Sequence, residues 1–285
     1  MKPFPIPVRA LGPGSQIEEE ELNYLPLPQG MATYAPPVLP EPEHLGTRPG
    51  AKAALAAIRA ALYRFTTGEL TANETARVDL SHLDSDDRTL INQVLGEGEV
   101  AAQVTGAHAV RIQESVFAGA WRVIVLDGET VLADWVEVGT IPTAIAAAAQ
   151  CGKPLTEPTQ VPPDVMNAPA ILTELADQVR NYRTGCAAYV VNLSLLPLAL
   201  GDVSFLDAQL GRGDVTILSR GYGNCRITTT GVPNCWRVTY YNSQDRVILD
   251  TIEIAAVPEV ACAAIEDLVD SCDRLGEVID WIDQR

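Results

Sequence analysis

Six cysteines and three histidines are the side chains of this sequence best suited to metal binding or nucleophilic chemistry. Zinc and iron–sulfur sites usually show some of their ligands a few residues apart, as in Cys-x-x-Cys. The cysteines show no such pairing; they are Cys151, Cys186, Cys225, Cys235, Cys262 and Cys272, and the histidines are His44, His82 and His108. We therefore expect no metal site and no cofactor, and we expect most of the thiols to be small buried groups.

The most unusual polar segment surrounds Cys225, in the run Ser219-Arg220-Gly221-Tyr222-Gly223-Asn224-Cys225-Arg226. Two glycines around a tyrosine allow a tight connection between strands with positive φ. This segment is either a hairpin turn alone or a turn that displays Tyr222, Asn224 and Cys225 to a partner. No histidine follows in this part of the chain to activate the Cys225 thiol, so we expect no enzyme.

This segment belongs to the second of two similar stretches of sequence. Leu95-Gly96-Glu97-Gly98-Glu99-Val100 returns as Leu210-Gly211-Arg212-Gly213-Asp214-Val215, 115 residues later (210 − 95). Trp121-Arg122-Val123 returns as Trp236-Arg237-Val238 at the same spacing. A period this long predicts the tandem duplication of a whole domain. The first copy has Gly106-Ala107-His108-Ala109-Val110 and lacks the Tyr, Asn and Cys, which favours a partner contact in the second copy.

The periodicity of apolar residues predicts the elements that position these segments. Amphipathic helices are expected at 51–65 and 171–182, each followed by a short strand and a short helix. The strands are expected at 76–80 and 188–193, and the short helices at 86–95 and 203–210. Four more strands are expected in the second copy, at 215–219, 225–230, 236–241 and 247–254. Antiparallel strands flanked by helices indicate an α+β fold with a mainly antiparallel sheet.

Composition divides the chain into four segments. They are a Pro-rich extended arm (1–50), a first divergent repeat (51–151), a Pro-rich linker (152–168) and a second repeat (169–285). A final helix is expected to begin at Pro258 and to lie on its own sheet, with a coiled coil as the alternative. Its apolar positions are Ala261, Ile265, Leu268, Cys272, Leu275, Ile279 and Ile282.

Two hairpins are predicted to place an arginine across from an aspartate. A four-residue turn at 242–245 sets Tyr241 opposite Arg246, which brings Arg237 opposite Asp250. A three-residue turn at 127–129 brings Arg122 opposite Asp134 in the first copy. We interpret both as structural ion pairs, partly buried, in which the loss of one partner has the larger effect.

The net charge of −17 argues against nucleic acid and anionic membranes as partners. It fits either solubility or a partner with a basic surface. No apolar window is long enough for a membrane span, and the sequence from Met1 lacks the pattern of a signal peptide. We therefore expect the protein in the cytoplasm.

Several segments carry a resemblance to a known family. They are Gly221-Tyr222-Gly223-Asn224-Cys225-Arg226-Ile227, Trp236-Arg237-Val238, Tyr241-Asn242-Ser243 and Ile248-Leu249-Asp250-Thr251, with Leu11-Gly12-Pro13-Gly14-Ser15-Gln16 in the arm. In order and spacing they resemble the HupH/HyaF family of hydrogenase expression/formation proteins. The resemblance covers essentially the whole chain.

The resemblance implies an accessory protein, a chaperone rather than an enzyme, for maturation of [NiFe] uptake hydrogenases. It implies action on the iron–sulfur small subunit precursor before export. Carried over to this chain, the family motif places partner contacts at Tyr222, Asn224, Cys225, Arg226, Asn242 and Ser243. Two alternatives stay open: an iron–sulfur or metal carrier that uses Cys225 and Cys235, and a scaffold for the active-site iron of the large subunit. The large subunit and other maturation proteins stay open as partners.

Overall fold

The computed structural model describes residues 48–70, 76–156, 158, 160–220 and 224–284. Most of the arm predicted over residues 1–50 lies outside the described residues, and so does Tyr222. The fold is α+β, as predicted, and is built around one antiparallel sheet of ten strands.

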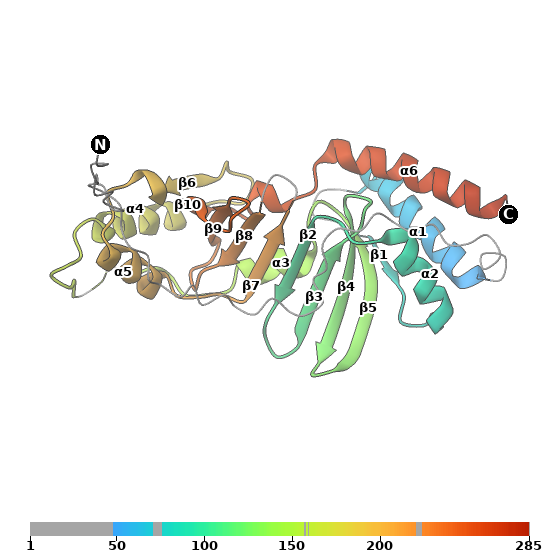
Figure 1. Ribbon diagram of the computed structural model, residues 1–285, viewed down its shortest axis with the longest axis horizontal. Helices are drawn as coiled ribbons and strands as arrows, with labels where there is room; N and C mark the ends of the chain where they lie inside the picture. The colour runs from blue at the N-terminus through green and yellow to red at the C-terminus, as the bar shows by residue number, and fades with distance from the viewer. Residues whose placement is uncertain (1–47, 71–75, 157, 159, 221–223, 285) are drawn as a thin grey trace, which may run out of the picture. The chain divides into compact units, whose positions relative to one another are not determined.

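The sheet consists of two halves with the same internal order of strands. The order across the sheet is β1-β5-β4-β3-β2-β7-β8-β9-β10-β6 (Figure 1), so each half reads identically from the middle outward. The first half comprises β1 (Ala76–Asp79), β2 (Val100–Val104), β3 (Ala109–Glu114), β4 (Ala120–Asp127) and β5 (Thr130–Val138). The second comprises β6 (Tyr189–Asn192), β7 (Val215–Ser219), β8 (Asn224–Thr229), β9 (Cys235–Tyr241) and β10 (Val247–Ile254). The halves meet where β2 pairs with β7.

Helices cover both faces of this sheet. They are α1 (Pro49–Thr66), α2 (Ser85–Leu95), α3 (Thr143–Ala149), α4 (Ala168–Asn181), α5 (Leu200–Leu210) and α6 (Ile265–Asp283), with short 3₁₀ turns η2 (Leu193–Leu195) and η3 (Glu259–Ala261). Directly paired residues share a face of a sheet. Val136 of β5 packs with α1 and α2, and Ile252 of β10 packs with α4 and α5. The chain of paired residues from β5 across the sheet to β10 puts these two side chains on the same face, so the two pairs of helices cover opposite ends of one face. We call this the outer face; α3 and η3 pack on the other, inner face.

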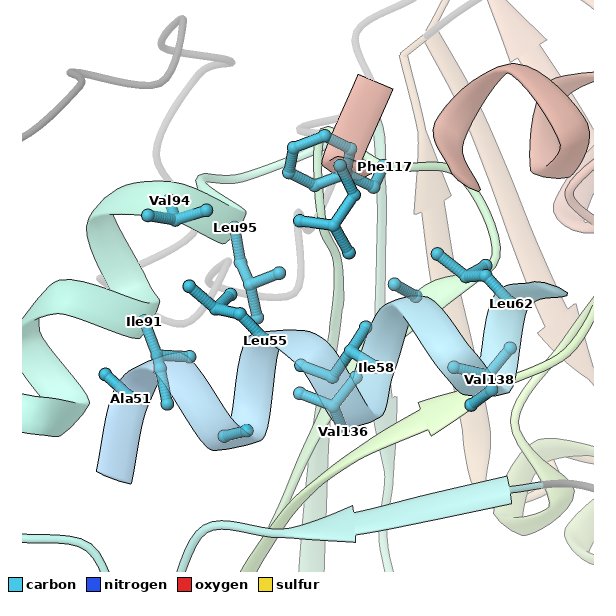
Figure 2. Packing of buried hydrophobic residues seen from close by; sticks show 14 of the residues in the cluster. Ala51, Leu55, Ile58, Leu62, Ile91, Val94, Leu95, Phe117, Val136 and Val138 are labelled. Atoms are coloured by element: carbon cyan, nitrogen blue, oxygen red, sulfur yellow. The ribbon is translucent and has the colours of Figure 1, made fainter. Parts of the chain in front are cut away.

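The first-half cluster of buried residues forms around α1 because its apolar residues recur every three or four positions. Leu55, Ile58 and Leu62 are fully buried against α2 and β5 (Figure 2). Val136 and Val138 supply the β5 side of this contact. A second-half cluster, built the same way from α4, α5, β9 and β10, lies at the other end of the outer face.

One buried carboxylate joins the two helices of the second half. Asp202, with no exposed surface, accepts N–H bonds from Met166, Asn167 and Ala168 at the start of α4 and from Ala199 before α5. The N–H of Ala168 is the largest influence, and together these donors lower the pKa of Asp202 to about 2 against the opposing effect of burial. Asp202 therefore fixes the starts of both helices relative to each other.

The C-terminal helix differs from the prediction. Pro258 begins only the short turn η3, after which the N–H of Ala263 donates to the carbonyl of Thr140 at 2.9 Å and interrupts the helix. Helix α6 then starts at Ile265 and packs beside α1 in the first-half cluster, not on the sheet of the second half. A Cβ at Gly119, where φ is +81°, would meet the Leu268 side chain at 2.3 Å, so α6 requires a glycine there.

Glu114, at the end of β3, is a buried carboxyl with an unusual pKa. It is 7% exposed, and burial raises its pKa to about 7. N–H groups of Gly119 and Val100 oppose this rise, whereas negative charge on Glu99 and Asp267 adds to it. Between about pH 4.5 and pH 7, the carboxyl of Glu114 therefore stays protonated in the folded protein, whereas in the unfolded chain, with its ordinary pKa of 4.5, it has lost the proton.

We expect Glu114→Gln to remove a pH dependence of stability. Because the pKa is raised in the folded state, the contribution of Glu114 to stability is fully present below about pH 4.5 and is lost as the pH rises to about 7; a shift of this size corresponds to about 3 kcal/mol. Thermal unfolding at pH 5 and pH 8 should show a smaller difference in Tm for the variant. Glu129→Gln, in the exposed β4–β5 turn, is the control. Equal pH profiles for wild type and Glu114→Gln would contradict the assignment.

Candidate partner-binding site

The start of β8 and the β9–β10 turn lie next to each other at one end of the sheet. Asn224 begins β8 and pairs with Tyr241, the last residue of β9. The start of β8, which follows the β7–β8 connection, therefore adjoins the β9–β10 turn, which contains Asn242 and Ser243. The structure thus brings together Asn224, Arg226, Asn242 and Ser243 from the predicted set, and Tyr222 belongs to the part of this connection that is not described.

Asn242 organises the β9–β10 turn. Its side-chain oxygen accepts the N–H of Gln244 at 2.8 Å and of Arg246 at 3.0 Å, and its own N–H donates to the carbonyl of Arg246 at 2.9 Å. Asp245 takes a positive φ of 57° to close the turn. The side chain of Asn242 is therefore committed to the turn, and it holds the exposed Ser243 in place.

Arg226 lies on the outer face beside these loops. It is half-buried, and its guanidinium carbon lies 5.9 Å from the centre of the Tyr241 ring. At this separation the positive charge is attracted to the aromatic face. Arg226 can therefore still donate hydrogen bonds outward while the ring fixes its position.

Cys225 points the other way, into the inner-face cluster. It is 3% exposed among Ile227, Trp236 and Val238. Burial raises the pKa of Cys225 to about 12, against a hydrogen bond with Tyr240 that lowers it. Because the thiolate is the reactive and metal-binding form, this thiol is inert at neutral pH.

Cys235 lies in a different cluster from Cys225. It belongs to the second-half cluster on the outer face, and burial raises its pKa to about 11. The two thiols therefore lie on opposite faces of the sheet and cannot share a metal ion. Within the described ranges, no group of three or more His, Cys, Asp or Glu side chains is arranged to hold a metal.

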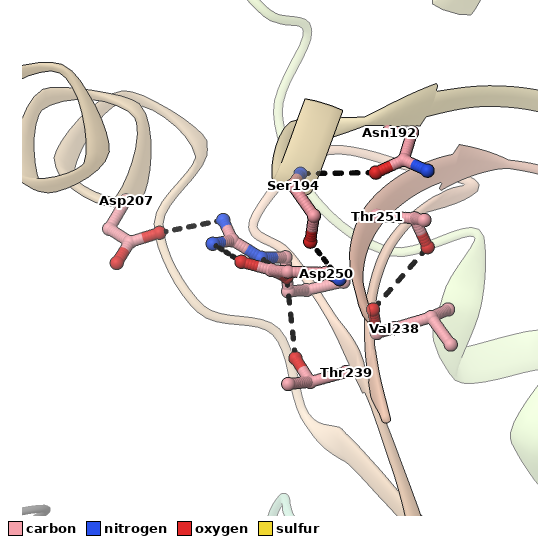
Figure 3. A network of polar contacts seen from close by, with 8 residues as sticks. Asn192, Ser194, Asp207, Val238, Thr239, Asp250 and Thr251 are labelled. Atoms are coloured by element: carbon pink, nitrogen blue, oxygen red, sulfur yellow. Dashed lines mark hydrogen bonds and ion pairs between the residues drawn. The ribbon is translucent and has the colours of Figure 1, made fainter. Parts of the chain in front are cut away.

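Each half carries an arginine–aspartate pair between neighbouring strands, more deeply buried in the first half than in the second. Arg237 donates to both carboxylate oxygens of Asp250 at 2.5 Å and to Asp207 of α5 at 3.0 Å. Ser194 accepts the N–H of Asp250 at 2.8 Å, and Thr239 donates to the same carboxylate at 3.4 Å (Figure 3).

The first half repeats this arrangement. Arg122 donates to both oxygens of Asp134, one of them at 2.6 Å, and to Asn92 of α2 at 2.7 Å. Ser81 accepts the N–H of Asp134, as Ser194 does for Asp250. The first pair therefore links β4 to β5 and to α2, and the second links β9 to β10 and to α5.

The registers that produce these pairs differ from the predicted ones. Asp250 pairs with Thr239 rather than with Arg237, and Tyr241 pairs with Val247. In the first half Asp134 pairs with Ile124, two residues from Arg122. An irregularity between Val247 and Leu249, and another between Val125 and Leu126, shift each hairpin. The arginine side chains therefore reach their aspartates diagonally.

The matches with known proteins coincide with the two halves of the sheet. The family described as "HupH hydrogenase expression protein, C-terminal conserved region" matches residues 49–151 and again residues 165–282. The chain belongs to this family. Each match spans one complete half, from α1 to the segment after α3 and from the start of α4 into α6.

Curated relatives extend the similarity to nearly the full chain. Hydrogenase expression/formation protein HoxQ of Cupriavidus necator is 51% identical over 284 residues, 99% of each chain. Hydrogenase expression/formation protein HupH of Rhodobacter capsulatus is 46% identical over 98% of each chain. The hydrogenase-1 operon protein HyaF of Escherichia coli is 34% identical over 95% of each.

Among solved structures, HupH from Thiobacillus denitrificans is 31% identical to this HupH-family chain. The match covers 39% of this chain and 92% of that one, with a TM-score of 0.37. Among the described residues of this chain, no helix combines the length and apolar character needed to cross a bilayer.

Proposed function

We propose that this chain is an accessory protein for hydrogenase maturation that works by binding a hydrogenase subunit. The observation that carries this proposal is similarity over 99% of the chain to a protein named for hydrogenase expression and formation. At one end of the second half, Asn224, Arg226 and Ser243 present polar groups that are at least partly exposed and lie near one another. Hydroxyl, amide and guanidinium groups at loop ends suit recognition of a polypeptide.

We further propose the iron–sulfur small subunit precursor as the subunit that is bound, with the protein in the cytoplasm and without an enzymatic step. Support comes from the buried state of Cys225, which leaves the loops without an activated nucleophile among their described residues. The large subunit, or another maturation protein, is the alternative partner. A carrier of iron–sulfur clusters is less favoured because Cys225 and Cys235 lie on opposite faces.

The two halves suggest that the chain arose by tandem duplication. They share their order of strands, the family matches each half separately, and both contain the same arginine–aspartate network. The loop residues differ between the copies, since the first has Gly106-Ala107-His108 in place of the second copy's glycine–tyrosine segment. Partner binding is therefore proposed for the second half.

An anaerobic pull-down tests this function. The tagged full chain is mixed separately with the small-subunit precursor and with the large subunit of a [NiFe] hydrogenase, and the complexes are identified by native mass spectrometry. We expect retention of the small-subunit precursor and at least a tenfold weaker complex for Asn224→Ala/Ser243→Ala. The control variant, His108→Ala/Glu129→Ala, changes exposed residues at the equivalent end of the first half.

Each other outcome points to a different conclusion. Retention of the large subunit alone would favour a scaffold that serves that subunit. Retention of neither would contradict direct action on a hydrogenase subunit. Iron bound to anaerobically purified protein, and lost on Cys225→Ser, would restore the carrier hypothesis.

A further inference from the structure

The middle of the outer face carries no helix among the described elements. The first-half and second-half clusters contain no residue of β2, β3, β7 or β8. The inner-face cluster takes alternate residues of these four strands, such as Ala102, Ile112, Ile217 and Ile227. The intervening side chains point to the opposite side, between the helix pairs α1–α2 and α4–α5. We call this surface the central strip; it is lined by Gln103, Arg111, Gln113, Thr216, Leu218 and Arg226.

The register gives the central strip a definite layout. Gln113 pairs with Ala101, which pairs with Leu218, which in turn pairs with Arg226. One row of side chains therefore crosses the seam between the halves with an apolar centre. In the adjacent row Arg111 pairs with Gln103, and Gln103 with Thr216.

Within the described strands β2, β3, β7 and β8, the charged side chains on this face are Arg111 and Arg226. Arg111 is exposed and has no ion pair within the described part of the chain. Arg226 contacts the Tyr241 ring and has no carboxylate partner among the described residues. Asp134 and Asp250, which share this face, are already bound by Arg122 and Arg237.

Two carboxylates mark the ends of the strip. Glu99 precedes β2 and lies opposite Arg220, whose N–H donates to its carbonyl. Asp214 precedes β7 and accepts a hydrogen bond from Thr105 at 3.3 Å. Between these two carboxylates the strip presents two guanidinium groups, although the chain as a whole has a net charge of −17.

The spacing of the two arginines defines what could bind them. Arg111 and Arg226 occupy equivalent positions of the two halves, on β3 and β8, with β2 and β7 between them. Three strand spacings and an offset of two residues separate their Cα atoms by about 16 Å. Residues i and i+4 of an extended chain lie about 13 Å apart and point to the same side, and long side chains on both partners cover the remaining few ångström. A guanidinium binds a carboxylate through two parallel hydrogen bonds.

We propose that the central strip is the docking surface for an extended acidic segment of the partner protein. Two carboxylates at positions i and i+4, which share one side of an extended segment, bind Arg111 and Arg226, and an apolar side chain at i+2 covers Ala101 and Leu218. Charge complementarity favours this occupant, because Arg111 and Arg226 have no carboxylate partner among the described residues and a carboxylate can pair with each. The assignment rests on the proposed function, in which the segment belongs to a hydrogenase subunit. It also extends the candidate site, through Arg226, into the first half.

A synthetic peptide tests the surface without a hydrogenase. The probe is a fluorescein-labelled peptide of eight residues with two glutamates at positions i and i+4 and valines between them, so that both carboxylates lie on one side of the extended chain. Fluorescence anisotropy with the full chain at low salt should show saturable binding, at least tenfold weaker in Arg111→Gln/Arg226→Gln. The control Arg180→Gln/Arg212→Gln removes the same charge from α4 and from the α5–β7 loop, and it should bind as the wild type does.

Several results would overturn the proposal. They are failure of the wild type to bind the peptide, equal binding of a version with glutamine in place of glutamate, and equal losses in both double variants. Thermal unfolding checks that each variant folds. If the double variant does not, Arg111→Gln alone, at an exposed position, should weaken the peptide complex at least threefold.

A second arm separates this proposal from the function on which it rests. Where the wild type captures a hydrogenase subunit, Arg111→Gln/Arg226→Gln should lose at least tenfold in affinity and the control double variant should not. Unchanged capture by Arg111→Gln/Arg226→Gln would overturn the strip as a docking surface and leave the proposed function intact. If the wild type captures neither subunit, the proposed function fails, and the peptide arm still decides whether the strip binds acidic segments.

Discussion

Asp134→Ala is expected to lower the free energy of unfolding by about 3–5 kcal/mol, because it leaves a buried arginine without its counter-ion. Asp134 is 4% exposed, and the side chain of Arg122 is 15% exposed. The substitution removes both carboxylate contacts and leaves Arg122 with only the amide oxygen of Asn92 among its described side-chain partners. Water cannot easily replace the lost carboxylate at this depth, so the cost should exceed that of a surface pair, about 0–1 kcal/mol.

Urea denaturation followed by circular dichroism measures this loss. Asp127→Ala, an exposed aspartate in the same hairpin, should leave the midpoint nearly unchanged. Asp250→Ala should destabilise less than Asp134→Ala, because the Asp250 side chain is 21% exposed and Arg237 keeps its contact with Asp207. A loss below about 1 kcal/mol for Asp134→Ala would show that the pair behaves as a surface pair.

Leu275→Ala is expected to cost about 2–5 kcal/mol, and the loss should be felt in the first half of the molecule. Leu275 is fully buried in the first-half cluster, although α6 follows the second half in the sequence. Truncation leaves a cavity between α6 and α1, where the surrounding side chains relax only partly. Amide hydrogen exchange should therefore speed up in α1 more than in α4.

Val269→Ala is the matched control, since Val269 lies on the same helix and is 45% exposed. It should change stability by less than about 0.5 kcal/mol. If Leu275→Ala loosened α4 as much as α1, the packing of α6 on the first half would not be its main contribution to stability.

The sequence predicted the elements well where apolar residues follow a clear period. The strands β7 and β10 have the predicted bounds, and α1 and α4 lie within three residues of theirs. Hairpin register was wrong because a turn of given length does not reveal an irregularity such as that between Val247 and Leu249. The packing of α6 was wrong for a related reason: its apolar spacing identifies a buried face but not the surface that buries it.

The candidate site was only partly accessible from the sequence. The glycine-rich segment and the Asn242 turn were identified by their composition, and pairing of Asn224 with Tyr241 brings them together. The motif did not show that Cys225 points inward, since one residue of register decides the face. The central strip was not predicted, because it depends on the pairing of β2 with β7 and on which part of the outer face the helices leave uncovered. In the sequence, only the arginines at the equivalent positions 111 and 226 pointed to it.

The crossing of α6 onto α1 has a consequence for synthesis of the chain. The first-half cluster is closed by Leu268, Cys272, Leu275 and Ile282, which are translated well over a hundred residues after α3. At about 5–20 residues per second, the ribosome reaches them about 6 to 30 seconds after the rest of that cluster has been translated. During this interval α1 offers an uncovered apolar face to the crowded environment of a nascent chain. A chain that terminates near residue 264 lacks α6, so this apolar face stays uncovered. Such truncated products should therefore aggregate and be degraded by proteases.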